Sequence, residues 1–169
     1  GDAVYTRLWL EYLAQHPPRP GPMSLLGENL HDFASEHPQF GSLPAMLDII
    51  ELETLLIALF DRADHSAYTL ADLQQLPADQ WPAARWPIRD DWALMRSDFD
   101  LEKYWAAMQD FLASDQSLAG EVPFGVERAG ATAQAQGNFY LVRRVQHRMQ
   151  FQRINAHMHS FLSALRAGH

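Results

Sequence analysis

Hydrophobic residues in the first half of the chain recur at the spacing of helices. The first stripe consists of Tyr5, Leu8, Trp9, Tyr12 and Leu13. The proline-rich segment HPPRPGP at residues 16–22 must end this helix, because proline lacks the N–H that a helix interior needs. A second helix is predicted to begin at Ser24 and to end near His37 and Pro38.

The third helix is predicted to be the centre of the fold. Its residues from Met46 to Phe60 are apolar on nearly every side, as expected for a helix that is buried all round. Ser42 is placed to cap it, and Pro44 is tolerated in its first turn. A short helical segment, LADLQQL, then follows a capping Thr69.

Beyond residue 87 the hydrophobic period changes from that of a helix to that of a strand. The stretch WALMRSDF alternates from Trp92 onward and predicts a strand, and Asp100 can cap the helix that follows. A loose Gly, Ala and Gln-rich stretch at 116–137 contains a candidate short strand at 122–126. Asn155 is placed to cap a last helix.

The segment NFYLVRRVQHRMQFQRIN at 138–155 predicts a β-hairpin. With the turn at 146–147, Val142 pairs with Phe151 and Arg144 with Met149, although neither Asn-Gly nor Asp-Gly marks the turn. Tyr140, Val142, Met149 and Phe151 then share one face. The predicted fold class is α+β: a helical domain at 1–85, and a small antiparallel sheet with flanking helices at 86–169.

Charge divides the chain unevenly. The net charge of the 169 residues is −8, yet 128–169 contain no Asp or Glu, and six arginines and four histidines instead. The basic part of the chain can therefore face an anionic partner. There is no cysteine, which excludes disulfides and thiolate chemistry, and no apolar run long enough to span a membrane. We expect a cytoplasmic protein without a membrane partner.

Catalytic and metal-binding patterns are sparse. The eight histidines show neither the HExxH nor the Glu-x-x-His spacing, so we predict no metal and no cofactor in this chain. No serine nucleophile motif and no glycine-rich phosphate loop occurs. The alternative of an enzyme rests on Asp48, Glu51 and Glu53 of the central helix, which also suit a hydrated stripe or ties to neighbouring loops.

The basic hairpin is the main candidate for a binding surface. It can add a peptide strand to its sheet, with arginines attracting acidic side chains. It can also neutralise nucleic-acid phosphates, or it is an ordinary solvated sheet face. The predicted peptide-binding residues are Tyr140, Val142, Arg143, Arg144, Gln150, Phe151 and Arg153.

The order of these features resembles a bacterial family labelled as a DNA-binding domain, which includes peptide-modification chaperones of the HvfC and BufC type and the methanobactin-biosynthesis subunit MbnC. The resemblance covers nearly the whole chain through loose patterns. The pieces are HPPRPGP, FASEHPQFGSLPAMLDIIELE with Asp64 after it, the Leu-Pro and Trp-Pro stretch, SDFDLEKYW, and YLVRRVQHRMQFQRI leading into FLSALRAG. Family members usually carry a helical segment upstream of the position of Ala3, so we expect either a missing N-terminal segment or the shorter methanobactin-type branch.

The resemblance implies a non-catalytic role beside an enzyme. Such proteins bind a TIM-barrel, multinuclear non-haem iron enzyme that oxidises cysteines of a ribosomally made precursor peptide, and they help to present the peptide's leader. The iron is thus expected in the partner enzyme. The family label leaves a DNA-binding transcriptional regulator as the alternative.

Overall fold

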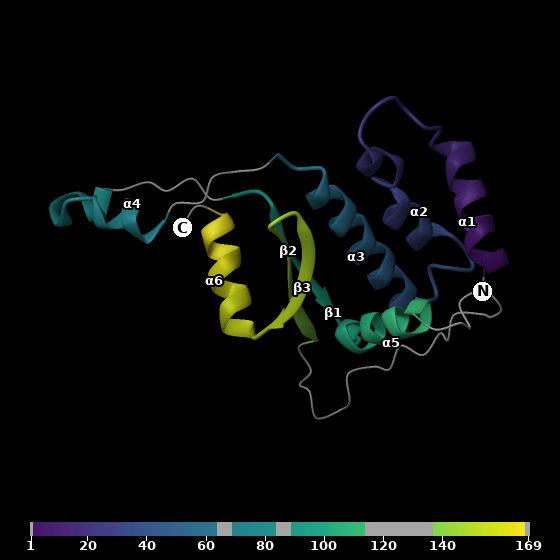
Figure 1. Ribbon diagram of the computed structural model, residues 1–169. Coiled ribbons are helices and arrows are strands. Elements are labelled where there is room, and N and C mark those ends of the chain that lie inside the picture. The colour runs from purple at the N-terminus through teal and green to yellow at the C-terminus, as the bar shows by residue number, and fades with distance from the viewer. Residues whose placement is uncertain (1, 64–68, 84–88, 114–136, 168–169) are drawn as a thin grey trace.

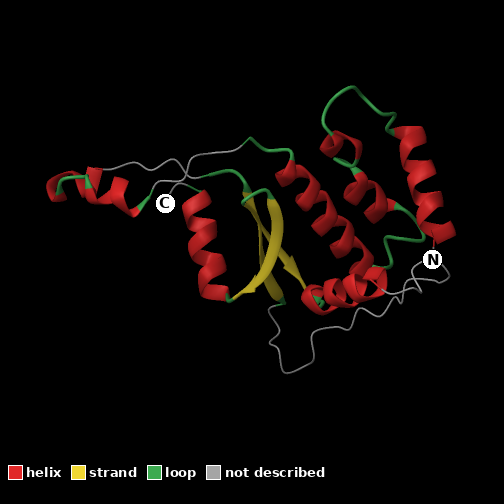
Figure 2. Ribbon diagram, in the orientation of Figure 1, coloured by secondary structure: helices red, strands yellow, loops and turns green. Residues whose placement is uncertain are grey.

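The computed structural model describes residues 2–63, 69–83, 89–113 and 137–167, and these form a mixed α+β fold as predicted (Figure 2). The elements in chain order are α1 (Asp2–Gln15), the 3-10 helix η1 (Met23–Leu26), α2 (Leu30–Glu36), α3 (Pro44–Phe60), α4 (Leu70–Gln74), the 3-10 helix η2 (Ala78–Ala83), β1 (Trp92–Ser97), α5 (Leu101–Ala113), β2 (Asn138–Val145), β3 (Arg148–Ile154) and α6 (Ala156–Arg166). The helical region therefore precedes the sheet.

The sheet has three antiparallel strands in the order β1-β2-β3. Helices α3 and α5 cover one face, which we call the core face, and α6 lies against the other, which we call the α6 face (Figure 1). Helices α1 and α2 pack on the far side of α3. Helix α4 and η2 expose nearly all of their described side chains, including Leu70 and Trp81.

Helix α3 joins two hydrophobic clusters, as its apolar character predicted. Ile49, Leu52 and Leu59 pack into the cluster beneath the sheet, whereas Ile50 packs into the cluster formed with α1 and α2. The predicted domain division at residue 85 falls within 84–88, outside the described residues. Because α3 contributes to both clusters, the helical region and the sheet share a core element.

The hairpin has the predicted register. Val142 is opposite Phe151 and Arg144 is opposite Met149. The turn residues Gln146 and His147 have φ angles of 48° and 62°, as a two-residue type I′ turn requires at both central positions. The sequence lacks the usual Asn-Gly at this turn, so the positive φ values are imposed on two residues with side chains.

Two predictions about the helical half are wrong. The expected second helix is divided, because the chain leaves η1 at Gly27, a residue of low helix propensity, before α2 begins. Ser42 does not cap α3: its hydroxyl donates to the carbonyl oxygen of Gln39, and Leu43 occupies the N-cap position. The candidate strand at 122–126 lies outside the described residues.

The other three predicted caps are confirmed. The Thr69 hydroxyl accepts a bond from the N–H of Asp72, whose carboxylate in turn accepts from the Thr69 N–H. Asp100 accepts from the N–H of Lys103 at 3.1 Å, and Asn155 accepts from the N–H of Met158 at 2.8 Å. Each cap lies within three residues of its donor in sequence, so a local pattern was sufficient to find it.

Candidate functional site

The seven predicted peptide-binding residues lie on both faces of the sheet. Opposite residues of an antiparallel pair share a face, and successive residues alternate between faces. The core face therefore carries Tyr140, Val142, Arg144, Phe151 and Arg153. Arg143 and Gln150 lie opposite one another on the α6 face.

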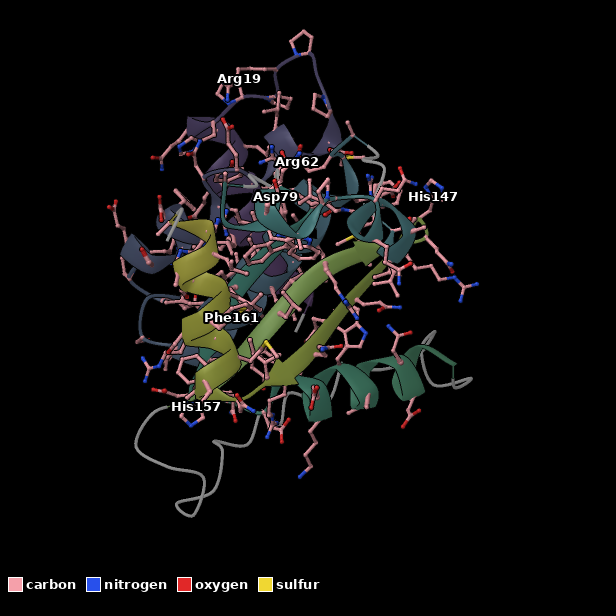
Figure 3. The ribbon with its side chains drawn as sticks, turned by 90° about the vertical axis from the view of Figure 1, so that its left-hand side faces the viewer. Arg19, Arg62, Asp79, His147, His157 and Phe161 are labelled. Carbon is pink, nitrogen blue, oxygen red and sulfur yellow. The ribbon has the colours of Figure 1, made fainter. Side chains whose placement is uncertain are left out.

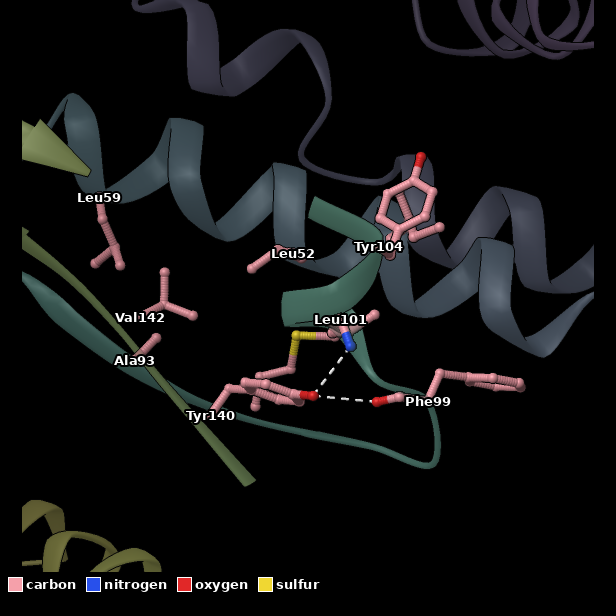
Figure 4. Packing of buried hydrophobic residues seen from close by; sticks show 10 residues of the cluster. Leu52, Leu59, Ala93, Phe99, Leu101, Tyr104, Tyr140 and Val142 are labelled. Carbon is pink, nitrogen blue, oxygen red and sulfur yellow. Dashed lines mark hydrogen bonds between the residues drawn. The ribbon is translucent and has the colours of Figure 1, made fainter. Parts of the chain in front are cut away.

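Tyr140 and Val142 belong to the core, so the prediction that they contact a peptide is wrong. Both side chains are 0% exposed. The Tyr140 hydroxyl donates to the carbonyl oxygen of Phe99 at 3.1 Å and accepts from the N–H of Leu101 at 3.0 Å (Figure 4). Burial raises the pKa of Tyr140. This hydroxyl joins β2 to the first turn of α5.

Phe151 lies at the border of the same core. It is half-buried, and its ring meets those of Trp105 and Tyr140 edge-on, at centroid distances of 5.5 and 5.9 Å. Its side chain holds α5 against the sheet. A peptide could reach the backbone of Phe151, but most of its ring is already in contact with the protein.

The charge of Arg153 is used inside the protein. Its guanidinium lies 2.7 Å from Asp100 and 3.7 Å from Glu102. Burial raises the pKa of Asp100, but the hydrogen bonds from the Lys103 N–H and from Arg153 outweigh it, so this pKa is lowered overall. The carboxylates of Asp100, which caps α5, and of Glu102, in its first turn, thus compete with any acidic ligand for Arg153.

Arg144 is also engaged. Its Nη1 donates to the carbonyl oxygen of Phe60 at 2.7 Å, at the C-terminal end of α3. The last carbonyls of a helix lack partners within the helix, and the negative end of the helix dipole attracts a cation. Arg144 therefore ties the sheet to α3 and is not presented to a partner as a free charge.

Arg143 differs from the other two arginines. Its Nη2 is 3.5 Å from the Oε1 of Gln152, which is longer than an ordinary N–H···O bond. Its Nε atom is buried and has no hydrogen-bond partner. Among the residues that the structure describes, Arg143 forms no ion pair. It is the predicted arginine whose charge remains available.

The outer edge of β3 is the second feature suited to binding. The N–H of Arg153 donates to Glu102 Oε1 at 2.8 Å, and so points away from β2. Backbone groups alternate in direction along an antiparallel strand, so those of Met149 and Phe151 also point outward. No other strand of the described chain pairs with this edge. Glu102 closes the Arg153 end of it.

Glu102 and Met149 were missed by the sequence reasoning. Glu102 had the signature of an ordinary acidic residue in the first turn of a helix, where carboxylates are common. Its bond to the β3 edge joins residues 51 positions apart. The hairpin register, combined with the position of β3 at an edge of the sheet, indicates that the N–H and C=O groups of Met149 point away from β2.

Of the three carboxylates in the alternative enzyme site, Asp48 has a structural hydrogen bond. The Ser97 hydroxyl donates to Asp48 at 2.5 Å and accepts from the N–H of Phe99 at 2.9 Å, which ties α3 to the end of β1. Burial raises the pKa values of Asp48 and Glu51, and Glu53 is half-buried. In the described residues, no group of three or more His, Asp or Glu side chains is placed to hold a metal ion.

No helix among the described residues is both long and apolar enough to cross a bilayer. The chain matches no protein-family model, no curated protein and no solved structure in the comparisons made with them. The family resemblance in the sequence therefore stays a prediction.

Proposed function

We propose that this protein is a non-catalytic partner subunit of a peptide-modifying enzyme. It binds the leader of a ribosomally made precursor peptide and presents it to a TIM-barrel, multinuclear non-haem iron enzyme that oxidises cysteines. The iron belongs to that enzyme, and this chain carries no cofactor of its own. We place the complex in the cytoplasm. The family resemblance supports this role, and one structural observation supports the mode of binding.

That observation is the outward backbone of β3. The N–H and C=O groups of Met149 and Phe151 offer a ladder to which an extended leader can add as a fourth strand. Glu102 already occupies the N–H of Arg153, so its carboxylate takes the place of a strand carbonyl and marks where the leader ends its pairing.

Side chains on the α6 face supply selectivity. A leader strand beside β3 would place alternate side chains next to Gln150 and Gln152, which are both exposed. Arg143 lies within 3.5 Å of Gln152 and forms no ion pair in the described chain. An acidic leader side chain at this position would gain the attraction of Arg143. Arg144 and Arg153 do not share this role, because the Phe60 carbonyl and the Asp100 carboxylate already hold their guanidinium groups.

The helical region provides the surface for the enzyme in this proposal. Leu10, Met23 and Leu43 are 65%, 68% and 45% exposed there. Large apolar side chains at the centre of an interface supply much of its stability. Helix α1 lies on the far side of α3 from the sheet, so an enzyme bound there would leave the β3 edge open to the peptide (Figure 1).

Isolation of the protein with its partners from the native host tests the role. We expect an iron-containing TIM-barrel enzyme to co-purify, identified by mass spectrometry and metal analysis. Recovery of the protein in a complex with other partners and no such enzyme would refute the proposal. Electrophoretic mobility shifts at near-physiological salt address the rival: tight, salt-sensitive binding to duplex DNA would favour a regulator.

The binding mode is tested by replacing Met149. Met149→Pro removes an outward N–H that the sheet does not use, which an edge strand tolerates. Met149→Ala shortens the same side chain and keeps the N–H. With the leader of the precursor encoded beside the co-purified enzyme, we expect at least about tenfold weaker binding for Met149→Pro than for Met149→Ala. Equal affinities would contradict strand addition at β3.

A further inference from the structure

A cavity of about 410 Å³ opens on the α6 face, at the end of the sheet nearest the hairpin turn. Its apolar walls include Trp92, Leu141 and Leu162, and its polar walls include Arg89, Asp91 and Arg143. Sites for small organic ligands combine apolar walls with polar groups that orient the ligand, and the volume lies in their range. The floor is formed by β1 and β2, so this cavity is separate from the β3 edge.

The charges around the cavity do not cancel. Arg89 holds Asp91 through two hydrogen bonds, one of them from Nε to Oδ1 at 2.9 Å. Asp91 is 3% exposed, and Arg89 lowers its pKa, so this carboxylate is ionised and already paired. Arg143 has no acidic partner in the described chain. The Arg89 and Asp91 pair is neutral, and the charge of Arg143 remains.

Arg143 also lacks an acceptor where it needs one. It is directly opposite Trp92 in the strand register, so both side chains project from the α6 face. Its Nε is buried without a hydrogen-bond partner, and its nearest acceptor, Gln152, is 3.5 Å away. A buried donor without an acceptor is unfavourable, and a ligand oxygen in the cavity would satisfy it.

A second cation lies at the border of the cavity. The guanidinium of Arg166, in the last turn of α6, lies 5.6 Å from the centre of the Trp92 ring. It forms no ion pair within the described residues. Arg166 adds positive potential near the Trp92 wall, and an anion that reached Arg143 would be attracted by both guanidinium groups.

We propose that this cavity binds a carboxylate group, with Arg143 as the charged donor and Trp92, Leu141 and Leu162 around the apolar part of the ligand. A planar carboxylate matches a guanidinium fork, and the buried Nε of Arg143 lacks the acceptor that a carboxylate oxygen would supply. The carboxylate can belong to a free organic acid or to the C-terminus of a peptide. Arg143 is also the arginine that the leader proposal uses, but binding of a carboxylate in the cavity does not require a leader at β3.

Titration of the ¹⁵N-labelled protein followed by NMR tests the proposal. Phenylacetate is the probe, and phenylacetamide is its neutral match. We expect phenylacetate to shift the amide signals around Trp92 and Arg143 and to bind at least about tenfold more tightly than the amide, because a charge-assisted bond is lost. Equal binding of the two probes, or tighter binding of inorganic phosphate, would overturn the carboxylate assignment.

A matched pair of variants locates the donor. Arg143→Gln should weaken phenylacetate binding about tenfold or more, whereas Arg148→Gln removes the same charge from an exposed position on the same face and should leave binding unchanged. Equal losses would show a general charge effect and refute the site. If Arg143→Gln fails to fold, the comparison of phenylacetate with phenylacetamide in the unchanged protein still tests whether the cavity prefers a carboxylate.

A tripeptide ending in phenylalanine, with a free or an amidated C-terminus, identifies the source of the carboxylate. Tighter binding of the free-acid tripeptide than of phenylacetate assigns the site to peptide C-termini. Tighter binding of phenylacetate assigns it to small acids. Both results support a carboxylate site, and binding of the amidated tripeptide as tight as that of the free acid would contradict it.

Discussion

The polar side chains of β2 and β3 differ in their hydrogen-bond and ion-pair partners between the two faces of the sheet. On the core face, the Tyr140 hydroxyl makes two hydrogen bonds, Arg144 holds the end of α3, and Arg153 is paired with two carboxylates. On the α6 face, Arg143 keeps a buried Nε without a partner. The polar groups of these core-face residues are thus satisfied within the described part of the protein, whereas the Nε of Arg143 on the α6 face is not.

The helices that cover the two faces differ in the same way. Helix α3 contributes four buried residues to the core, whereas the described residues of α6 include none that is buried. Figure 3 marks Phe161 on α6, where this side chain is 59% exposed, and Met158 one turn earlier is 46% exposed. Helix α6 therefore buries fewer side chains than α3 and leaves more apolar surface exposed.

Neighbouring residues of β1 give the largest contrast between the faces. Met95 is 2% exposed on the core face, so Met95→Ala should lower the free energy of unfolding by about 2–5 kcal/mol. Leu94 is half-buried on the α6 face, and Leu94→Ala should cost clearly less. Urea denaturation measures both. Losses of equal size would show that α6 packs as tightly as α3 and would remove the contrast.

Removal of one oxygen tests the polar network of the core face. Tyr140→Phe removes the side-chain acceptor of the Leu101 N–H and one donor to the Phe99 carbonyl, which still accepts from Asn138 Nδ2 at 2.9 Å. We expect a loss of about 1–3 kcal/mol in the free energy of unfolding, measured by chemical denaturation. A change within about 0.5 kcal/mol would mean that these groups find other partners and that the network adds little.

Arg143 and Arg144 are adjacent in sequence but lie on opposite faces of the sheet, so the same substitution in each compares the two faces. Arg144→Ala removes the bond to the Phe60 carbonyl and should lower the free energy of unfolding by about 0.5–1.5 kcal/mol. Arg143→Ala should change it by no more than about 0.5 kcal/mol, because the side chain has no strong partner to lose. Thermal unfolding of both variants measures the difference. A larger loss for Arg143→Ala would indicate a structural role that the α6 face does not show.

The smallest expected effect on stability concerns Glu51 on α3, where His31 of α2 and Asp48 are the neighbouring charged groups. Burial raises the pKa of Glu51, so its carboxylate is less favourable in the folded than in the unfolded protein. The folded state binds more protons, and stability falls as pH rises from the unfolded value of about 4.3 through the raised pKa. Glu51→Gln should therefore be slightly more stable at pH 7, by about 0.5 kcal/mol, and the gain should vanish below pH of about 4. Unfolding curves at both pH values test this.

Much of the fold could be predicted from local patterns. The alternation from Trp92 indicated β1, and the hairpin register followed from one turn position. Thr69, Asp100 and Asn155 cap helices as predicted, because a cap and its donor lie three residues apart. The Ser42 cap failed because the same hydroxyl had another local acceptor, the Gln39 carbonyl.

The candidate site was predicted less well, for a reason visible in its arginines. Arg143, Arg144 and Arg153 look equivalent in a basic hairpin, and alternation separates them only into two faces. Their partners are the Phe60 carbonyl, 84 residues from Arg144, and the acids of α5, about 50 residues from Arg153. Neither contact leaves a signal in the hairpin sequence. Burial of Tyr140 and Val142 likewise depends on which face the distant α3 covers.

By itself the sequence determined the fold class, the strands of the hairpin with their register, and three helix caps, because each depends on periodicity or on contacts a few residues apart. The tertiary structure decided which face of the sheet is core, which of Arg143, Arg144 and Arg153 lacks an acidic or carbonyl partner among the described residues, and that Glu102 occupies one end of the outer edge of β3. These depend on contacts between residues far apart in the chain, whose partners are chosen by packing and not by any local pattern.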